Sequence, residues 1–198
     1  DRAVADLPPL TILSRGSLLA RLQVEEALPA LRSVFPGREF QANIVETVGD
    51  KDLVTALTDS SVPTDFFTRE LDRAQLDGEV DIVIHSAKDL PDPLPDGLTV
   101  AAMLPARDTR DVLILRQGET VDDIRVIGTS SPVREAVMRE RFPHAECRPI
   151  RGGIGRRIEQ IDNGDYDALV TAGCAMQRLG WDDRITEWLD YETTPLQG

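Results

Sequence analysis

The chain has 198 residues, and its 35 acidic and 22 basic residues give a formal net charge of −13. So acidic a chain is unsuited to coating nucleic acid or to docking on an anionic membrane, because both need a basic surface. No apolar run approaches the ~20 residues of a transmembrane helix, and no secretory signal is visible. We therefore expect a cytoplasmic globular protein with no nucleic-acid or membrane partner.

Cysteine and histidine are scarce. Cys147 and Cys174 are the two cysteines and His85 and His144 are the two histidines, and no spacing among them resembles a zinc site or a disulfide framework. We expect two free thiols in a reducing compartment and no metal site. Of the 22 basic residues only Lys51 and Lys88 are lysines. Codon bias explains much of this, although planar guanidinium groups also suit carboxylates and phosphates.

The first half of the chain reads as alternating strands and helices. The expected strands span residues 10–14, 40–47 and 80–85, and the expected helices span 18–31 and 65–76. Ser17 is well placed to cap the first helix, whereas Pro29 should kink or split it. Residues 48–63 are polar, acidic and without a clear period, which predicts a mobile loop.

The second half starts the pattern again. Its expected strands span residues 111–115, 126–128, 147–150 and 168–171, and its expected helices span 132–142, 155–163 and 172–180. Residues 76–84 and 162–170 are alike, since each segment is a helix end, a glycine turn, an acid and a buried strand. Alternating strands and helices favour parallel α/β sheets. We predict an α/β fold of two similar domains with mixed, mostly parallel sheets and a cleft between them.

The domain boundaries follow from this repeat. We expect domain 1 to comprise residues 1–104 with about 190–198, and domain 2 to comprise residues 105–189.

Several arginines stand in or just after the expected strand-to-helix turns. They are Arg15, Arg134, Arg151, Arg157 and Arg178. Ligands of such sheets bind beyond the carboxyl ends of the strands, where helix N-termini offer free N–H groups. Five cations at this edge predict an anionic ligand. The alternative is that each is an exposed arginine with no role, which is weaker for five together. The glycine-rich segment 151–157 lacks the spacing of a P-loop and reads as a carboxylate-binding turn.

Asp89 is the candidate for chemistry. It follows a buried strand and stands beside Lys88. A carboxylate there can act as a general acid or base, or stabilise a cation. The alternative is a surface Lys–Asp pair before a proline-rich loop. His85, on the strand itself, is expected to support the site and not to catalyse.

Several motifs in order carry a resemblance. They are residues 14–17 (Ser-Arg-Gly-Ser), 85–91 (His-Ser-Ala-Lys-Asp-Leu-Pro), 127–131 (Ile-Gly-Thr-Ser-Ser), 150–152 (Ile-Arg-Gly) and 177–180 (Gln-Arg-Leu-Gly). From about residue 10 to residue 188, the chain resembles the hydroxymethylbilane synthase, or porphobilinogen deaminase, family of tetrapyrrole biosynthesis.

The resemblance implies a fold and an activity. The first two of the family's three domains are like type II periplasmic binding proteins. Its enzymes join four porphobilinogen units head to tail with release of ammonia, and the oligopyrrole grows on a dipyrromethane cofactor. We expect this protein to be a monomer. By motif match Asp89 is the catalytic carboxylate, which assists loss of the aminomethyl nitrogen and stabilises the azafulvene-like cation. The implied carboxylate-binding residues are Arg15, Ser17, Lys88, Ser130, Arg134, Arg151, Arg157 and Arg178.

The chain departs from the family pattern at a few positions. Val133 replaces one of two paired arginines, Gly153 replaces an asparagine, and residues 62–66 replace the family's entry to a lid. The family holds its cofactor through a cysteine of the third domain, which would follow Gly198, and neither cysteine of this chain matches it. We expect no turnover by the 198-residue piece alone. The alternative function is a truncated or divergent non-catalytic module that binds a pyrrole or another polycarboxylate.

Overall fold

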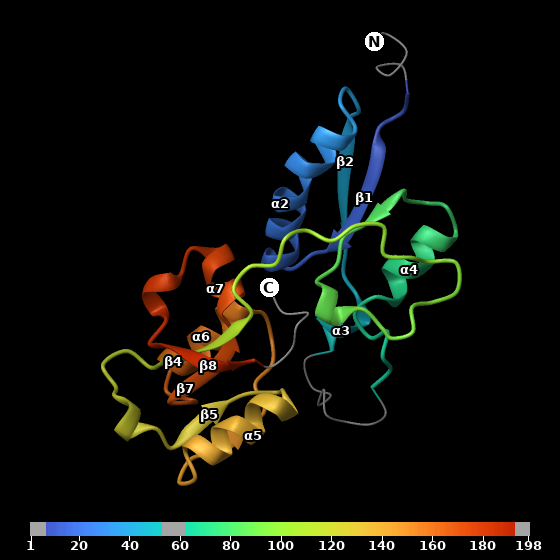
Figure 1. Cartoon of the computed structure of the whole chain (residues 1–198). Coiled ribbons are helices and arrows are strands. Elements are labelled where there is room, and N and C mark those ends of the chain that lie inside the picture. Colours follow the sequence, from blue (N-terminus) through green and yellow to red (C-terminus); the bar gives the residue numbers. More distant parts are fainter. Residues whose placement is uncertain (1–6, 53–61, 193–198) are drawn as a thin grey trace. The chain divides into compact units, whose positions relative to one another are not determined.

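The computed structural model describes residues 7–52 and 62–192. The chain divides into two compact units, residues 1–52 with 63–105 and residues 53–62 with 106–198. Each unit has its own sheet (Figure 1).

The first unit is built on a parallel sheet of three strands. Its strands are β1 (Leu10–Arg15), β2 (Phe40–Val45) and β3 (Ile82–Val83), in the order β2-β1-β3. The register aligns Arg15 with Val45, so the carboxyl ends of β1 and β2 meet at one edge. The helices are α2 (Leu18–Val34), α3 (Val48–Lys51) and α4 (Arg69–Leu76), with a 3₁₀ turn at Ala87–Asp89. Ile12 and Leu71, both fully buried, belong to its core.

Helix α2 begins as predicted but does not break. The Ser17 hydroxyl accepts a hydrogen bond from the Ala20 N–H at 3.2 Å, which confirms the cap. The helix continues through Pro29 to Val34, so the predicted split is wrong. Burial of Val24 and Ala27 on the inner face of α2 offsets the backbone hydrogen bond that proline removes.

The segment expected to be a loop from residue 48 begins as a helix. Thr47 and Asp50 form a reciprocal capping box around α3, which stabilises a single turn even without apolar periodicity. The prediction is therefore wrong for Val48–Lys51. Residues 53–61 of the expected loop lie outside the described residues.

The second unit is built on a mixed sheet of five strands in the order β6-β5-β7-β4-β8. The strands are β4 (Arg110–Leu115), β5 (Val126–Gly128), β6 (Glu146–Arg148), β7 (Ala168–Ala172) and β8 (Glu187–Glu192). Strands β5, β6 and β7 are parallel, whereas β4 runs antiparallel to β7 and β8. The α-helices are α5 (Pro132–Arg141), α6 (Ile154–Asp162) and α7 (Gly173–Leu179). The predicted α/β class with mixed, mostly parallel sheets is confirmed.

Strand β8 closes the edge of this sheet. Val112 pairs with Trp188, and the Trp188 ring fills the space where a side chain on Gly173 would lie, with its Cζ3 only 2.2 Å from that position. Residues 190–192 continue β8, whereas the sequence analysis assigned the chain from about residue 190 to the first domain. The alternation that buries Leu189 fits this strand, so pairing with β4 extends to Glu192.

Candidate functional site

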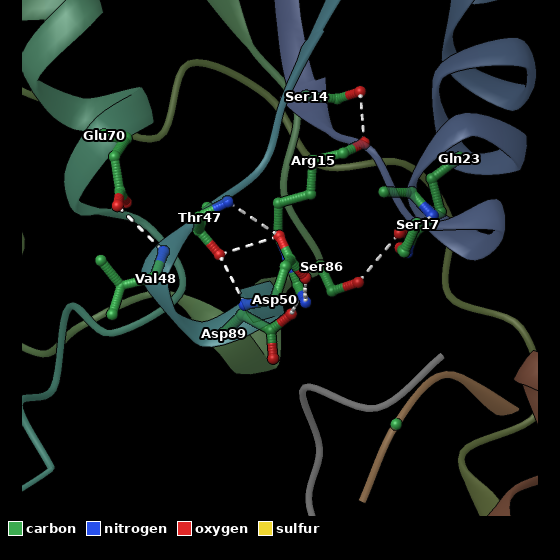
Figure 2. Close-up of polar contacts among 12 residues, drawn as sticks. Ser14, Arg15, Ser17, Gln23, Thr47, Val48, Asp50, Glu70, Ser86 and Asp89 are labelled. Carbon is green, nitrogen blue, oxygen red and sulfur yellow. Dashed lines mark hydrogen bonds and ion pairs between the residues drawn. The ribbon is translucent and has the colours of Figure 1, made fainter. Parts of the chain in front are cut away.

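Three side chains meet where the strands of the first sheet end. Arg15 is the last residue of β1, Asp50 lies in the turn of helix that follows β2, and Asp89 lies in the 3₁₀ turn after β3. Parallel strands place their carboxyl ends at one edge, so residues far apart in sequence come together there. Figure 2 shows the three side chains converging, with Thr47 and Ser86 beside them.

Arg15 is shared unequally between the two carboxylates. Its Nε lies 3.1 Å from Oδ1 and 3.3 Å from Oδ2 of Asp50, and its Nη2 donates to the same Oδ1. A single nitrogen, Nη1, contacts Asp89, at 3.2 Å from Oδ2. The guanidinium carbon also lies 4.5 Å from the centre of the Phe67 ring, a cation–π contact. Arg15 is therefore fixed on several sides.

Asp50 is anchored by the capping box of α3. Its Oδ2 accepts hydrogen bonds from the Thr47 N–H at 3.1 Å and the Thr47 hydroxyl at 2.8 Å. Burial alone would raise the pKa of Asp50, but the hydrogen bonds from Arg15 and Thr47 outweigh it and leave that pKa below its usual value. Asp50 is thus a fixed anion.

Asp89 is held through its backbone more than through its side chain. Its N–H donates to the Ser86 carbonyl at 2.9 Å, and the Ser86 hydroxyl donates to Oε1 of Gln23 in α2 at 2.9 Å. The Asp89 side chain is 23% exposed and takes one guanidinium contact. A carboxylate held in this way keeps most of its lone pairs for a ligand.

His85 lies behind this group. Its Nε2 is 3.8 Å from Oδ1 of Asp72, whose other oxygen accepts from the Thr68 hydroxyl at 2.7 Å. Burial lowers the pKa of His85, and Arg15 lowers it further, against the opposing influence of Asp72 and Asp89. The histidine is therefore a neutral, half-buried support at neutral pH.

The other expected residues of the first unit differ in setting. The Ser17 hydroxyl is engaged as the cap of α2, and Lys88 is exposed in the 3₁₀ turn next to Asp89.

The second sheet has a similar edge. Asp111, at the start of β4, pairs with Ala172 at the carboxyl end of β7. Arg134, in the first turn of α5, donates from Nε and Nη2 to the two oxygens of Asp111 at 2.9 and 2.8 Å. The Asp111 side chain is fully buried and that of Arg134 is 13% exposed. This bidentate ion pair fixes Arg134 at the edge of the second sheet.

A cluster of cations surrounds Arg157. Burial, and then the charges of Arg134 and Arg151, lower the pKa of Arg157 to about 10. Its Nε donates to the Gly152 carbonyl at 2.8 Å. Because the positive charges of Arg134 and Arg151 act on Arg157, an anion bound beside Arg157 would be stabilised.

Ser130 fixes the turn that presents Arg151. Its hydroxyl donates to the Ile150 carbonyl at 2.7 Å and accepts from the Ile150 N–H at 3.0 Å. Arg178, by contrast, lies in the last turn of α7 and not at the strand-to-helix turn that the sequence analysis assigned to it. The structure thus groups Arg15 with Asp89 in one unit, and Arg134, Arg151 and Arg157 in the other. That all five arginines face one cleft stays a prediction.

Sequence reasoning missed Asp50, Phe67 and Asp111. The Thr47-x-x-Asp50 spacing is a capping-box signature and could have marked the short helix. No sequence signal points to Phe67 or Asp111, whose roles depend on where arginine side chains reach.

Comparison with known proteins places this geometry in a family. Residues 10–198 match the dipyrromethane cofactor-binding domain of porphobilinogen deaminase. The chain belongs to the porphobilinogen deaminase family. It is 39% identical over 193 residues to the porphobilinogen deaminase of Burkholderia orbicola and 37% identical over 189 residues to that of Burkholderia ambifaria. These alignments cover 95% and 94% of this chain but only 58% and 57% of the relatives.

Solved structures support the fold. The VFT2 periplasmic domain of BvgS from Bordetella pertussis is 16% identical and superposes with a TM-score of 0.50 over 96% of this chain and 80% of that one. An ancestral cationic amino acid solute-binding protein is 12% identical and gives 0.50 over 88% of this chain and 74% of that one. These likenesses confirm the predicted fold of periplasmic binding proteins. Among residues 7–52 and 62–192, no helix is long and apolar enough to cross a membrane, and no three potential metal ligands cluster.

Proposed function

We propose that the full-length protein is a hydroxymethylbilane synthase that joins four porphobilinogen units head to tail. In each coupling the bond from the aminomethyl carbon to nitrogen breaks, ammonia leaves, and a carbon–carbon bond to the next pyrrole forms. The observation that carries this proposal is Asp89, held at the edge of the first sheet with a single guanidinium contact.

Asp89 is the proposed catalytic carboxylate. Loss of ammonia leaves positive charge on the pyrrole, and a fixed carboxylate stabilises charge that develops beside it. Asp89 also accepts and returns pyrrole protons, a role for which a carboxylate needs lone pairs free of neighbours. Arg15 limits this freedom only slightly, because it gives Asp89 one contact at 3.2 Å.

The arginines of the second unit fit the cofactor. Dipyrromethane carries acetate and propionate side chains, and the pKa of Arg157 is lowered first by burial and then by the charges of Arg134 and Arg151. When bound, the cofactor supplies the pyrrole to which the first substrate is joined. We propose that these arginines, with Arg178, Lys88, Ser17 and Ser130, hold carboxylates of the cofactor and of the oligopyrrole.

The remaining properties follow from the same proposal. We propose a cytoplasmic monomer whose partners are porphobilinogen and oligopyrrole intermediates. The net charge of −13 is consistent with a protein that avoids nucleic acid and anionic membranes. We also propose the division into two domains that the sequence predicts, residues 1–104 with about 190–198 and residues 105–189.

The test is an Asp89→Asn variant of the full-length protein, with the dipyrromethane assembled and verified by intact mass. Hydroxymethylbilane formation should fall by at least ~10²–10⁴-fold, the usual worth of general acid–base catalysis. Substrate binding and the fold should persist, because asparagine preserves shape. Asp96→Asn, an exposed position in the following loop, is the control and should keep full activity. Wild-type turnover by Asp89→Asn would end the assignment.

A further inference from the structure

We propose that Asp50 is a positioning residue: it occupies most of the Arg15 guanidinium, so that Arg15 cannot pair fully with Asp89. This inference rests on the proposed role of Asp89 in the reaction.

The division of donors carries the inference. A guanidinium forms its strongest pair when two of its N–H groups meet both oxygens of one carboxylate. Arg15 directs Nε and Nη2 to Asp50 and leaves only Nη1 for Asp89, at 3.2 Å from one oxygen. Without Asp50, the Arg15 guanidinium group is free to rotate and to donate from two nitrogens to the Asp89 carboxylate. That pair would resemble the one that Arg134 makes with the buried Asp111.

Asp50 is held by hydrogen bonds with Thr47. Thr47 donates two hydrogen bonds to its Oδ2, and the Asp50 N–H returns one to the Thr47 hydroxyl at 3.2 Å. The Val48 N–H donates to Oε1 of Glu70 at 2.9 Å, which ties the start of α3 to α4 (Figure 2). Phe67 covers one face of the guanidinium. These protein contacts preorganise Asp50 and Arg15.

The electrostatic consequence falls on Asp89. The charged and titratable groups around it are Arg15 from β1, Asp50 from α3, His85 after β3 with Asp72 of α4 behind it, and the adjacent Lys88. Removing the charge of Asp50 would strengthen the attraction between Arg15 and the Asp89 carboxylate in two ways. One negative neighbour is lost, and Arg15 becomes free for a closer pair.

The experiment uses Asp50→Asn in the full-length protein with assembled dipyrromethane. Asparagine can still accept the Thr47 hydrogen bonds, but it cannot hold Arg15 by charge. We expect kcat to fall about 10- to 100-fold, as for a catalytic group moved slightly out of place, with KM within twofold of wild type. The acid limb of the kcat–pH profile should move to lower pH, because Arg15 is then free to pair more closely with the Asp89 carboxylate.

Asp123→Asn is the matched control. Asp123 forms the same kind of capping box, with Thr120, but contacts no site residue. It should match wild type in kcat, KM and pH profile. Thr47→Val loosens Asp50 without changing charge, so it should shift the acid limb in the same direction by less. If Asp50→Asn does not fold, this second variant decides the question.

Two results would overturn the inference: a wild-type kcat and acid limb, or a loss of activity through KM with the acid limb unmoved. The proposed function is tested separately, because it depends on Asp89→Asn and not on any change at Asp50.

Discussion

Asp89 and Asp111 are both carboxylates beside an arginine at a sheet edge, yet their settings differ. Asp111 is fully buried and takes two guanidinium nitrogens, whereas Asp89 is partly exposed and takes one. The first geometry makes a structural pair, and the second leaves a group able to meet a ligand. Residue type alone does not separate these roles. They differ in how many guanidinium nitrogens contact the carboxylate.

This contrast predicts a stability difference. Asp111→Asn removes the charge that Arg134 contacts through two nitrogens, and breaking a buried ion pair from one side costs about 3 kcal/mol of unfolding free energy. The matched control is Asp108→Asn, because Asp108 pairs with Arg110 through two nitrogens as well, but at an exposed position. That change should cost less than about 1 kcal/mol. Urea unfolding of the 198-residue chain measures both, and equal losses would contradict the distinction.

At the scale of elements, the short helix α3 depends on a close approach. A Cβ on Gly49 would lie 2.4 Å from the Phe67 ring and 2.9 Å from the Phe66 carbonyl oxygen. The helix therefore packs against the turn before α4 only because this residue is glycine. The same packing brings Phe67 under Arg15.

Two glycine substitutions should act in opposite directions. Gly49→Ala forces Phe67 or α3 to move and should lower the unfolding free energy by about 1–3 kcal/mol. Gly155→Ala, inside α6, meets only an ordinary contact with Trp181 at 3.6 Å. It should raise the unfolding free energy by up to about 0.5 kcal/mol, because alanine favours a helix but Gly155 lies in the first turn. Thermal unfolding of the two variants gives the signs, and a neutral Gly49→Ala would show that α3 packs loosely.

The elements also show how far the sequence can be read. Apolar runs and turn residues predict β1, β4, β7 and the start of α2 closely. Strand β3 is shorter than its apolar run, because the Asp81 carboxylate, not a strand carbonyl, accepts the Thr11 N–H at 2.8 Å. Arg15 and Asp89 were predictable, since both follow parallel strands of one sheet. Asp50 was not, because its role depends on a side-chain contact across 35 positions of sequence.

At the scale of the whole molecule, the acidic residues that give the chain its net negative charge also pair with many of its arginines. Many arginines in the described residues form ion pairs, such as Arg69–Asp65 and Arg184–Asp162. Against this background Arg157 differs, because it is largely buried and the charges of Arg134 and Arg151 act on it. A net charge of −13 keeps anions away in general, so a local cluster of this kind is what admits a polycarboxylate.

Global stability should carry the signature of one buried histidine. Burial lowers the pKa of His85 below its usual 6.5, so below that pH the unfolded chain binds a proton that the folded chain does not. Stability therefore falls as pH drops from about 7 toward 5.5, by up to about 1.4 kcal/mol per pH unit. The carboxylates with lowered pKa, such as Asp50 and Asp81, begin to contribute to such a loss only below about pH 5.

His85→Gln should flatten the slope between pH 7 and 5.5, because the proton uptake that separates the two states is gone. The chain offers a clean comparison, since His144 is its only other histidine and is exposed. His144→Gln should leave the wild-type slope unchanged. Urea unfolding at intervals of half a pH unit measures all three proteins. A wild-type slope in His85→Gln would mean that another group titrates in this range, and that His85 is not held neutral beneath Asp89.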